Sequence, residues 1–396
     1  MNGWSLVRLG DVCEFEKEQG LHDGLPYVGL ENIESGTGRF VGTTNAVTVK
    51  SSTFRFSQAH VLYGRLRPYL NKVLLPDFEG HCSTEIFPIK PGQGILRRYL
   101  FHWLSMDATV KMIDATSTGA RMPRANMNAV LDFVIPLPSL PDQRRIVDII
   151  DEAFDGIAAA EATAEKNLGN AREIYESQVQ LVFASIGEQW QDTPLASVCA
   201  VKDGTHDSPQ YVDDGVPFVT QKNIRRGGLS FANTKFISKE DHANFYRRSN
   251  VELGDILISM IGANRGMACL VDDDRTFSIK NVGLVKGSER FNPHFLLAYL
   301  KSPKALRYVL SGSKGGAQSF IGLTELRAFP VPVPPIDRQD AVAASLLSLS
   351  TETDRLQAIF EQKLNALNEL RKSLLHQAFN GHLTAAKTAE EMEAVA

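Results

Sequence analysis

The sequence predicts an α+β fold built from two tandem halves, each a globular block followed by one long helix, with the two helices pairing as an antiparallel coiled coil. Three observations support this: a helical stretch that occurs twice, a repeat that extends into the blocks, and short strand-like runs inside each block. The expected boundaries are 1–139 and 188–335 for the blocks, 140–187 and 336–384 for the helices, and 385–396 for a disordered tail.

The long helix is the clearest part of the repeat. Gln143 to Phe183 and Gln339 to Phe379 span the same 40 positions, so the copies superpose at an offset of 196 without a gap. Apolar or small side chains recur at steps of three and four, which is typical of a coiled-coil seam. A helix of ~40 residues is roughly 60 Å long and cannot bury such a seam alone. The nearest partner is the other copy, and the alternative is two unrelated surface helices.

The expected seam consists of Ile146, Ile150, Ala153, Ile157, Ala160, Ala164, Ala171 and Ile174 in the first helix, and Val342, Leu346, Leu349, Leu356, Phe360, Leu367, Leu370 and Leu374 in the second.

The repeat also covers the globular blocks. The segment from Trp4 to Cys13 is echoed by the segment from Trp190 to Cys199 at an offset of 186. Because the offset grows to 196 before the second helix, the second block carries about ten extra residues. The protein is therefore a tandem duplication of a block and a helix.

Inside each block, short apolar runs separated by Gly, Asp and Pro indicate strands. They lie at 46–49, 61–63, 72–75 and 86–89 in the first block and at 256–259, 267–271 and 282–285 in the second. Helices are expected at 97–106, 128–131, 294–300 and 324–327.

Composition narrows the class of protein. With 43 % hydrophobic and 22 % charged residues among 396, the chain is typical of soluble globular proteins. No apolar run approaches the ~20 residues needed to span a bilayer, and the N-terminus lacks a signal-peptide pattern. The four cysteines are scattered without a CxxC pair, so we expect reduced core residues in a cytoplasmic protein and no zinc site.

The charge is unevenly distributed along the chain. The net charge is +1 for residues 1–139, −6 for 140–189, +4 for 190–335 and −3 for 336–396, which together give −4. This pattern suits blocks that touch DNA and helices that face solvent or other proteins, although charged helix surfaces are usually only solvated faces.

The sequence contains no recognisable catalytic motif. The glycine-rich run at 312–316 lacks the spacing of a phosphate-binding loop, and the Asn/Asp-Pro-Pro-Tyr/Phe box of amino-methyltransferases is missing. Glu361 and Lys363 have the spacing of a nuclease site, but they lie within the second helix, where a strand is required. The nine histidines are scattered.

Loops in both blocks instead combine basic, amide and aromatic side chains. Arg reads guanine through paired hydrogen bonds, Asn and Gln read adenine, and Lys, Ser and Thr hold phosphates. For any single residue a solvated turn is as good an explanation, but the whole set favours DNA. The candidate DNA-binding residues are Arg65, Arg67, Tyr69, Lys72, Arg121 and Arg124 in the first block, and Lys222, Asn223, Arg225, Lys314, Gln318 and Ser319 in the second.

With this organisation the chain resembles the specificity subunit of type I restriction-modification systems. The resemblance covers nearly the whole chain. It rests on the Pro-x-Pro lead-ins at 136–138 and 332–334, on Gln143 and Gln339 with the helices that follow, and on the Gly-Ala-Arg and Gly-Ala-Gln loops.

The resemblance implies that each block is a target recognition domain reading one half of a bipartite double-stranded DNA site. The helices set the spacing of the half-sites and dock two methyltransferase (modification) subunits, which hold S-adenosylmethionine. Restriction and translocase subunits add ATP- and Mg-dependent activity. The specificity subunit itself catalyses nothing. Because recognition domains diverge widely, no base-reading position transfers by motif.

Two alternatives come from other classes of protein. A self-sufficient DNA methyltransferase or nuclease is disfavoured by the missing motifs. A non-catalytic coiled-coil scaffold that joins two protein-binding domains would share the helices but would not bind DNA. Within the leading interpretation, Arg121 and Gln318 are expected to read bases, since they occupy equivalent places after Gly-Ala and differ in chemistry.

Overall fold

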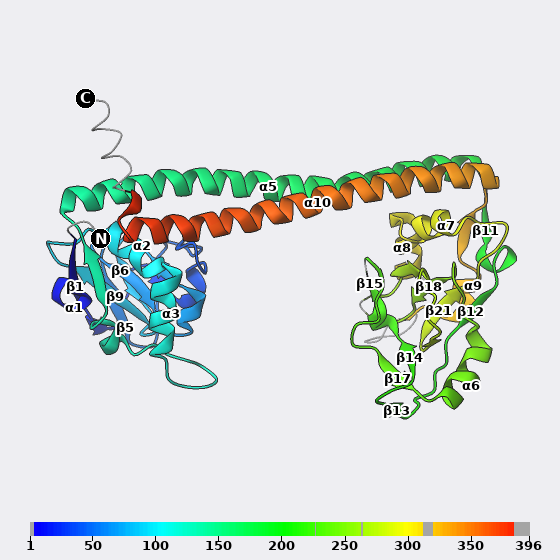
Figure 1. The fold of residues 1–396 in the computed structure, drawn as a ribbon, viewed down its shortest axis with the longest axis horizontal. Coiled ribbons are helices and arrows are strands. Elements are labelled where there is room, and N and C mark those ends of the chain that lie inside the picture. The colour runs from blue at the N-terminus through cyan, green and yellow to red at the C-terminus, as the bar shows by residue number, and fades with distance from the viewer. Residues whose placement is uncertain (1–3, 226, 263, 312–319, 384–396) are drawn as a thin grey trace. The chain divides into compact units, whose positions relative to one another are not determined.

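The computed structural model describes residues 4–225, 227–262, 264–311 and 320–383. The chain divides into two compact units: unit 1 comprises Met1–Ala164 with Gln362–Ala396, and unit 2 comprises Glu165–Glu361. Each unit therefore combines one α+β domain with part of both long helices (Figure 1). The expected tail at 385–396 lies outside the described residues.

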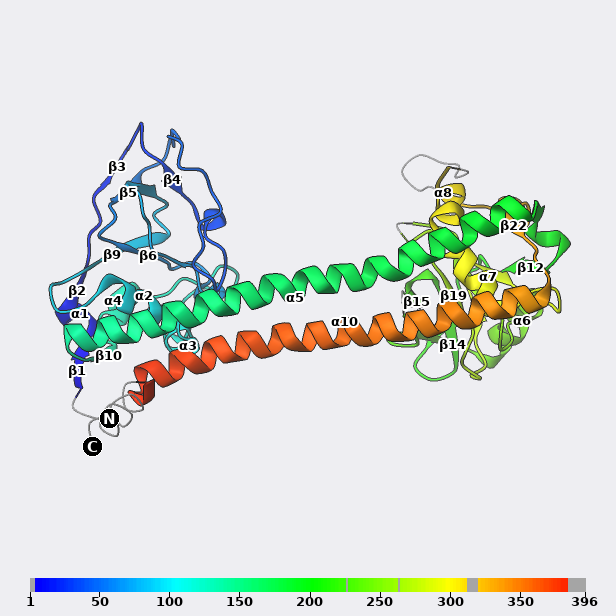
Figure 2. The same cartoon turned by 90° about the horizontal axis from the view of Figure 1, so that it is seen from above.

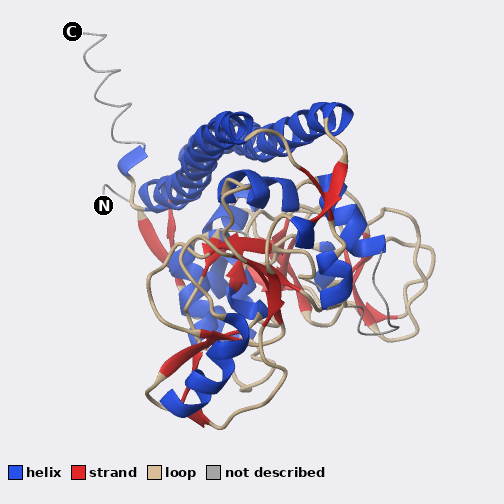
Figure 3. Cartoon of the chain, turned by 90° about the vertical axis from the view of Figure 1, so that its right-hand side faces the viewer, coloured by secondary structure: helices blue, strands red, loops and turns tan. Residues whose placement is uncertain are grey.

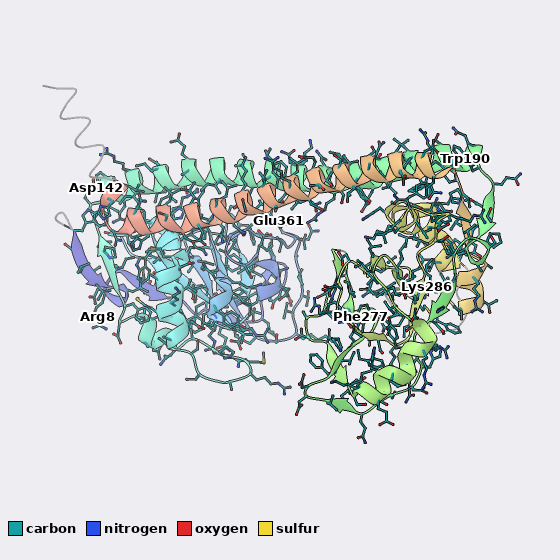
Figure 4. All side chains as sticks on the ribbon, turned by 45° about the vertical axis from the view of Figure 1, so that its right-hand side comes forward. Arg8, Asp142, Trp190, Phe277, Lys286 and Glu361 are labelled. Carbon is teal, nitrogen blue, oxygen red and sulfur yellow. The ribbon has the colours of Figure 1, made fainter. Side chains whose placement is uncertain are left out.

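The domain of unit 1 contains three small sheets. The central one has the antiparallel order β2 (Cys13–Phe15), β9 (Ile86–Pro91), β6 (Val61–Gly64), β7 (Val73–Leu74). The second has the order β3 (Gln19–Gly20), β5 (Thr53–Phe56), β8 (Gly80–Cys82), β4 (Tyr27–Val28), with β4 parallel to β8. In the third, β1 (Ser5–Arg8) pairs with β10 (Val134–Leu137), and Arg8 forms an ion pair with Asp132 (Figure 4).

Helices cover the central sheet of unit 1. Strand β6 is buried along its whole length because β9 and β7 flank it and α2 packs against all three strands. The helices are α1 (Leu9–Val12), α2 (Arg97–Ser105), α3 (Asp107–Ala115) and α4 (Met127–Val130), with 3₁₀ turns η1 (Leu30–Asn32) and η2 (Pro68–Leu70).

Unit 2 repeats this domain. Its central sheet has the matching order β12 (Val201–Asp203), β21 (Val282–Val285), β18 (Ile256–Ser259), β19 (Ala268–Leu270). A second four-stranded sheet has the order β13 (Tyr211–Val212), β17 (Lys235–Ile237), β14 (Val216–Val219), β20 (Ser278–Ile279). Two further sheets have two strands each: β15 (Ile224–Arg225) pairs with β16 (Gly228–Leu229), and β11 (Asp192–Pro194) pairs with β22 (Pro330–Pro332). Figure 3 shows how short these strands are beside the loops that join them.

Helices of unit 2 also follow the order of unit 1, with one addition. They are α6 (Lys239–Ser249), α7 (Pro293–Leu300), α8 (Pro303–Ser311) and α9 (Leu323–Arg327), with 3₁₀ turns η3 (Leu195–Ser197) and η4 (Gln221–Asn223). Helices α7, α8 and α9 correspond to α2, α3 and α4, whereas α6 belongs to unit 2 alone. The duplication that the repeat predicted is confirmed.

The long helices are α5 (Leu140–Gln189) and α10 (Ile336–Phe379), which run antiparallel within each unit (Figure 2). In unit 1, Ile146 shares a core with Phe379, whereas Glu161 pairs with Arg371 at 3.6 Å. In unit 2, Arg172 pairs with Glu361 at 3.6 Å (Figure 4), whereas the later part of α5 packs on the start of α10. The predicted antiparallel pairing is therefore confirmed.

The seam is more polar than expected. Ile146, Ile150, Ala164 and Ala171 are buried as predicted, as are Val342 and Leu346. Ile174, Leu356 and Leu370 are instead 47 %, 38 % and 47 % exposed, and Thr353 is buried in the seam. An α-helix has 3.6 residues per turn, so a stripe with a strict 3.5-residue repeat drifts around a straight helix. These three apolar residues are therefore exposed to solvent and not packed in the seam.

A buried glutamine fixes the start of each long helix. Gln143 is fully buried; its Oε1 accepts a hydrogen bond from Leu96 N at 2.8 Å, and its Nε2 donates to Gly94 O at 3.0 Å and Pro138 O at 2.9 Å. Gln339 makes the same three bonds, to Asn292 N, Arg290 O and Pro334 O, at 2.8–3.0 Å. The repeated glutamine thus ties each helix to the loop that precedes α2 or α7.

A buried phenylalanine fixes the far end of each helix. Phe183 of α5 packs on Phe295 and Tyr299 of α7, with ring centroids 5.4 and 5.2 Å away. Phe379 of α10 packs on Tyr99 of α2 at 4.8 Å. Both domains therefore use the start of one long helix and the end of the other as parts of their cores.

Candidate DNA interface

Two loops of unit 1 lie side by side. One joins β6 to β7 across residues 65–72, and the other joins α3 to α4 across residues 116–126. Arg67 N donates to Pro123 O at 2.7 Å, and Ala125 N donates to Arg65 O at 2.9 Å. The structure therefore brings Arg65, Arg67 and Arg124 together from distant parts of the sequence.

The first loop is held in a defined conformation. Arg67 and Asn71 have left-handed backbones with φ of 52° and 48°, unusual for residues other than glycine, and they flank η2. Asn71 Nδ2 donates to Ser105 O at 2.9 Å, which anchors the loop between α2 and α3. The Arg67 side chain is exposed and has no hydrogen-bond or ion-pair partner among the described residues.

Glu85 connects the two loops. It precedes β9, and its carboxylate accepts hydrogen bonds from Arg65 Nε at 2.9 Å and Arg124 Nε at 2.8 Å. Burial opposes ionisation of Glu85, but the hydrogen bonds from the two arginines outweigh it and hold the pKa of the carboxyl below its ordinary value. The sequence analysis missed Glu85 because a lone glutamate before a strand belongs to no motif.

The second loop exposes its tip. Gly119 has φ of 95°, which only glycine adopts without strain, and Gly119, Ala120, Arg121 and Met122 are all exposed. Tyr69 in the neighbouring loop is 54 % exposed. Arg121 also has no ion-pair partner among the described residues, so its guanidinium is available to a ligand.

Two sequence candidates have their side chains engaged inside the domain. Lys72 Nζ donates to Leu30 O at 2.6 Å and Ile33 O at 2.9 Å, which ties η1 to the first loop. Asn223 is 6 % exposed; its Oδ1 accepts from Thr220 N at 2.9 Å, and its Nδ2 donates to Ser230 O at 2.9 Å. Both side chains therefore support neighbouring backbone within their own domain.

Unit 2 joins its equivalent segments in the same way. Ile261 forms an isolated bridge with Phe320, as Leu66 does with Arg124, and Ile321 N donates to Met260 O at 2.9 Å. Lys314, Gln318 and Ser319 lie outside the described residues. Lys222 on η4 and Arg225 on β15 are exposed.

Asn281 occupies in unit 2 the place that Glu85 has in unit 1. Its Oδ1 lies 2.6 Å from Nδ1 of His206, whose Nε2 lies 3.1 Å from Asp203 Oδ2. Asp203 is buried and accepts both Nε and Nη2 of Arg248 at 2.8–2.9 Å. The two domains therefore present different chemistry at one equivalent position.

The described residues contain no group of three or more His, Cys, Asp or Glu side chains placed to hold a metal ion. Burial raises the pKa of the Cys13 and Cys269 thiols to about 12, since the apolar cores that enclose them oppose thiolate formation. Among the described residues, the helices lack the combination of length and apolar character that a membrane span requires.

Comparison with known proteins identifies relatives of the whole arrangement. The model of the type I restriction modification DNA specificity domain matches residues 1–168 and again 187–368. The EcoBI specificity subunit of Escherichia coli is 24 % identical over 336 residues, which are 76 % of this chain and 68 % of that protein. The MjaVIII specificity subunit of Methanocaldococcus jannaschii is 22 % identical and covers 96 % of this chain and 93 % of its own length.

Solved structures share the fold. A chain from a study of complex assembly and conformational transition in the type I R-M system aligns with a TM-score of 0.81 at 22 % identity, covering 96 % of this chain and 99 % of that one. The HsdS subunit from Thermoanaerobacter tengcongensis gives 0.59 at 21 % identity and covers 96 % and 98 %. With its duplicated domains, its paired helices and a family match across both halves, the chain belongs to the type I restriction-modification DNA specificity family.

Proposed function

We propose that this chain is the DNA sequence-specificity subunit of a type I restriction-modification complex. Each domain reads one half of a bipartite site, and α5 and α10 set the spacing of the halves. The observation that carries this proposal is the duplication itself: two domains with the same sheet order place their paired loops at equivalent positions but equip them with different side chains. Two half-sites of different sequence require this combination.

In the proposed interface, Arg67, Tyr69 and Arg121 of unit 1 and Lys222 and Arg225 of unit 2 contact DNA. All are exposed. Arginine reads guanine bidentately or binds phosphate, and the exposed tyrosine offers a ring for apolar contact with a base or sugar. Lys314, Gln318 and Ser319 remain candidates from the sequence alone.

The long helices are proposed to dock two methyltransferase subunits. Apolar side chains that gather into one exposed patch, rimmed by polar residues, mark surfaces that bind another protein. In unit 2, a surface groove of about 950 Å³ between α5 and α10 is lined by Ile174, Leu349 and polar residues. The exposed large apolar residues on the two helices are Ile174, Leu181, Ile336, Leu347, Leu356, Ile359 and Leu370.

The docking proposal has a matched test. Leu181→Glu and Leu347→Glu place a charge at helix positions that are 63 % and 53 % exposed, and Leu253→Glu does so at a 67 % exposed position in the domain of unit 2. A buried unpaired charge at an interface weakens binding strongly. Both helix variants are expected to lose co-purification with the methyltransferase, whereas the Leu253 variant keeps it. Equal binding by all three variants would contradict the docking surface.

We further propose that the chain itself catalyses nothing and binds no cofactor. S-adenosylmethionine is held by the methyltransferase subunits, and ATP and Mg by the restriction and translocase subunits. The test is to incubate the purified chain with DNA and S-adenosylmethionine, with and without its methyltransferase partner, and to measure DNA methylation. Methylation is expected only in the complex and only at a split sequence. Methylation by the chain alone would overturn the assignment, and a chain that never binds DNA would favour a protein scaffold instead.

A further inference from the structure

The residue that precedes β9 in unit 1 and the residue that precedes β21 in unit 2 occupy the same place in the central sheet. Ile86 of β9 faces Gly64 at the end of β6, and Val282 of β21 faces Ser259 at the end of β18. Glu85 and Asn281 stand one residue before these pairs. Each therefore lies where the central sheet meets the paired loops.

In unit 1, the Glu85 carboxylate binds two arginine side chains, each through its Nε–H group. Arg65 and Arg124 both donate their Nε–H to its carboxylate, at 2.9 and 2.8 Å. A guanidinium has five N–H donors, so this leaves the terminal amino groups to other partners. Those of Arg65 have no hydrogen bond within the described residues, and Arg124 makes only a long contact of 3.4 Å to Met122 O. Two guanidinium edges are thus left with unused donors.

The surroundings of Glu85 are rich in positive charge and hold the guanidinium of Arg65 in place. Arg65 lies 5.4 Å from the centroid of Phe87, and Lys17 lies 4.4 Å from the same ring. The exposed Arg67 and Arg121 belong to the two loops that Glu85 connects. One carboxylate thus faces an excess of cations, which suits a ligand that offers hydrogen-bond acceptors and negative charge.

Side chains of unit 2 at this position differ in kind. Asn281 Oδ1 lies 2.6 Å from Nδ1 of the His206 imidazole, and His206 in turn contacts the buried Asp203, which accepts the hydrogen bonds of the Arg248 guanidinium. The same place in the fold thus carries a pair of arginines in unit 1 and an amide with an imidazole in unit 2.

We propose that Glu85 is the positioning residue for base reading in the first half-site, and that Arg65 and Arg124, fixed by it, bind the O6 and N7 acceptors of guanine in the major groove. This inference rests on the proposed function and adds the base class of one half-site. Preorganised guanidinium groups lose less conformational entropy on binding than free ones, so fixing them sharpens the preference for guanine.

The test uses the complex of the full chain with its methyltransferase subunits and a DNA library randomised in the bipartite site. Glu85→Gln keeps the size of the side chain but turns one acceptor into a donor, which releases one arginine. Glu79→Gln is the matched control, since Glu79 is 60 % exposed and lies 3.7 Å from Arg55 in the same unit. Glu85→Gln is expected to lower the preference for guanine in one half-site about tenfold or more, with the other half-site unchanged. The control is expected to change neither.

An unchanged preference in Glu85→Gln, or equal relaxation of both half-sites, would overturn the role of Glu85. If that variant does not assemble, Arg65→Lys and Arg124→Lys carry the same test, because they keep the charge and remove the Nε–H. Either must then relax guanine preference in one half-site only; otherwise the inference is wrong. A wild-type complex that methylates no split sequence would instead refute the proposed function, so the two failures are distinguishable.

Discussion

Replacing Gln143 by Ala removes the side chain that locks α5 to its domain. Gln143 is fully buried and makes one hydrogen bond as acceptor and two as donor, to the main chain of Leu96, Gly94 and Pro138. Alanine leaves all three main-chain groups without this partner. Since the site lies inside the protein, water cannot replace the lost bonds without entering the core.

The cost follows from the groups left behind. An orphaned buried donor or acceptor costs about 1–3 kcal/mol, and the Leu96 N–H, with a single hydrogen to donate, suffers most. The two carbonyl oxygens each retain a second lone pair, so their loss is smaller. We expect the free energy of unfolding to fall by about 3 kcal/mol in total. For a domain of about 200 residues, this lowers the melting temperature by roughly 6–12 °C.

Thermal and urea unfolding of Gln143→Ala measure this loss, and amide hydrogen exchange at Leu96 localises it. Gln180→Ala is the control, because Gln180 is exposed on the same helix and should change stability by less than about 0.5 kcal/mol. The reasoning fails if the two variants are equally stable, or if exchange at Leu96 is no faster in Gln143→Ala than in the wild type.

Two further predictions concern the helix end and the pH dependence. Phe379→Ala removes a 3 % exposed ring that packs on Tyr99. Urea unfolding should show that the free energy of unfolding falls by about 3–5 kcal/mol. A loss below about 1 kcal/mol would show that this contact is not part of the core. Hydrogen bonds from Arg275 lower the pKa of Asp273 from the ordinary value of 3.8 to about 2. The stability that this pair adds to the folded state is therefore present above pH 3.8 and is lost as the pH falls through about 2. In Arg275→Ala, NMR titration should find the pKa of Asp273 raised toward 3.8, and an unchanged pKa would exclude Arg275 as the cause.

Much of the fold could be predicted from the sequence because residues that occur at equivalent positions in both halves of the repeat are expected to have equivalent structural roles. The constant offset between Gln143 and Gln339 predicted equivalent roles, and their hydrogen bonds are equivalent. Local periodicity was weaker evidence. The apolar run at 46–49 was expected to be a strand, but it is largely exposed and forms no strand; it contributes an isolated bridge from Ala46 to Pro26 and a contact of Val47 O with His81 Nε2 at 3.1 Å. Helices α1, α3, α6 and α8 were not predicted.

The site was harder to predict because its geometry depends on contacts between distant segments. Arg65 and Arg124 were found as basic loop residues, but their shared partner Glu85 was not, since nothing local distinguishes it. Lys72 and Asn223 match the composition of a DNA-binding loop, yet their hydrogen bonds support neighbouring backbone. Residue type alone does not separate a side chain that faces a ligand from one that holds the loop.

The central claim is that each domain reads one half of a split DNA site. The most direct measurement maps every sequence methylated by the wild-type complex and by its Arg121→Ala variant. The account predicts a motif of two short specified halves separated by a spacer of fixed length, with the variant relaxed in one half and unchanged in the other. A single continuous motif, or a variant relaxed equally in both halves, would contradict it.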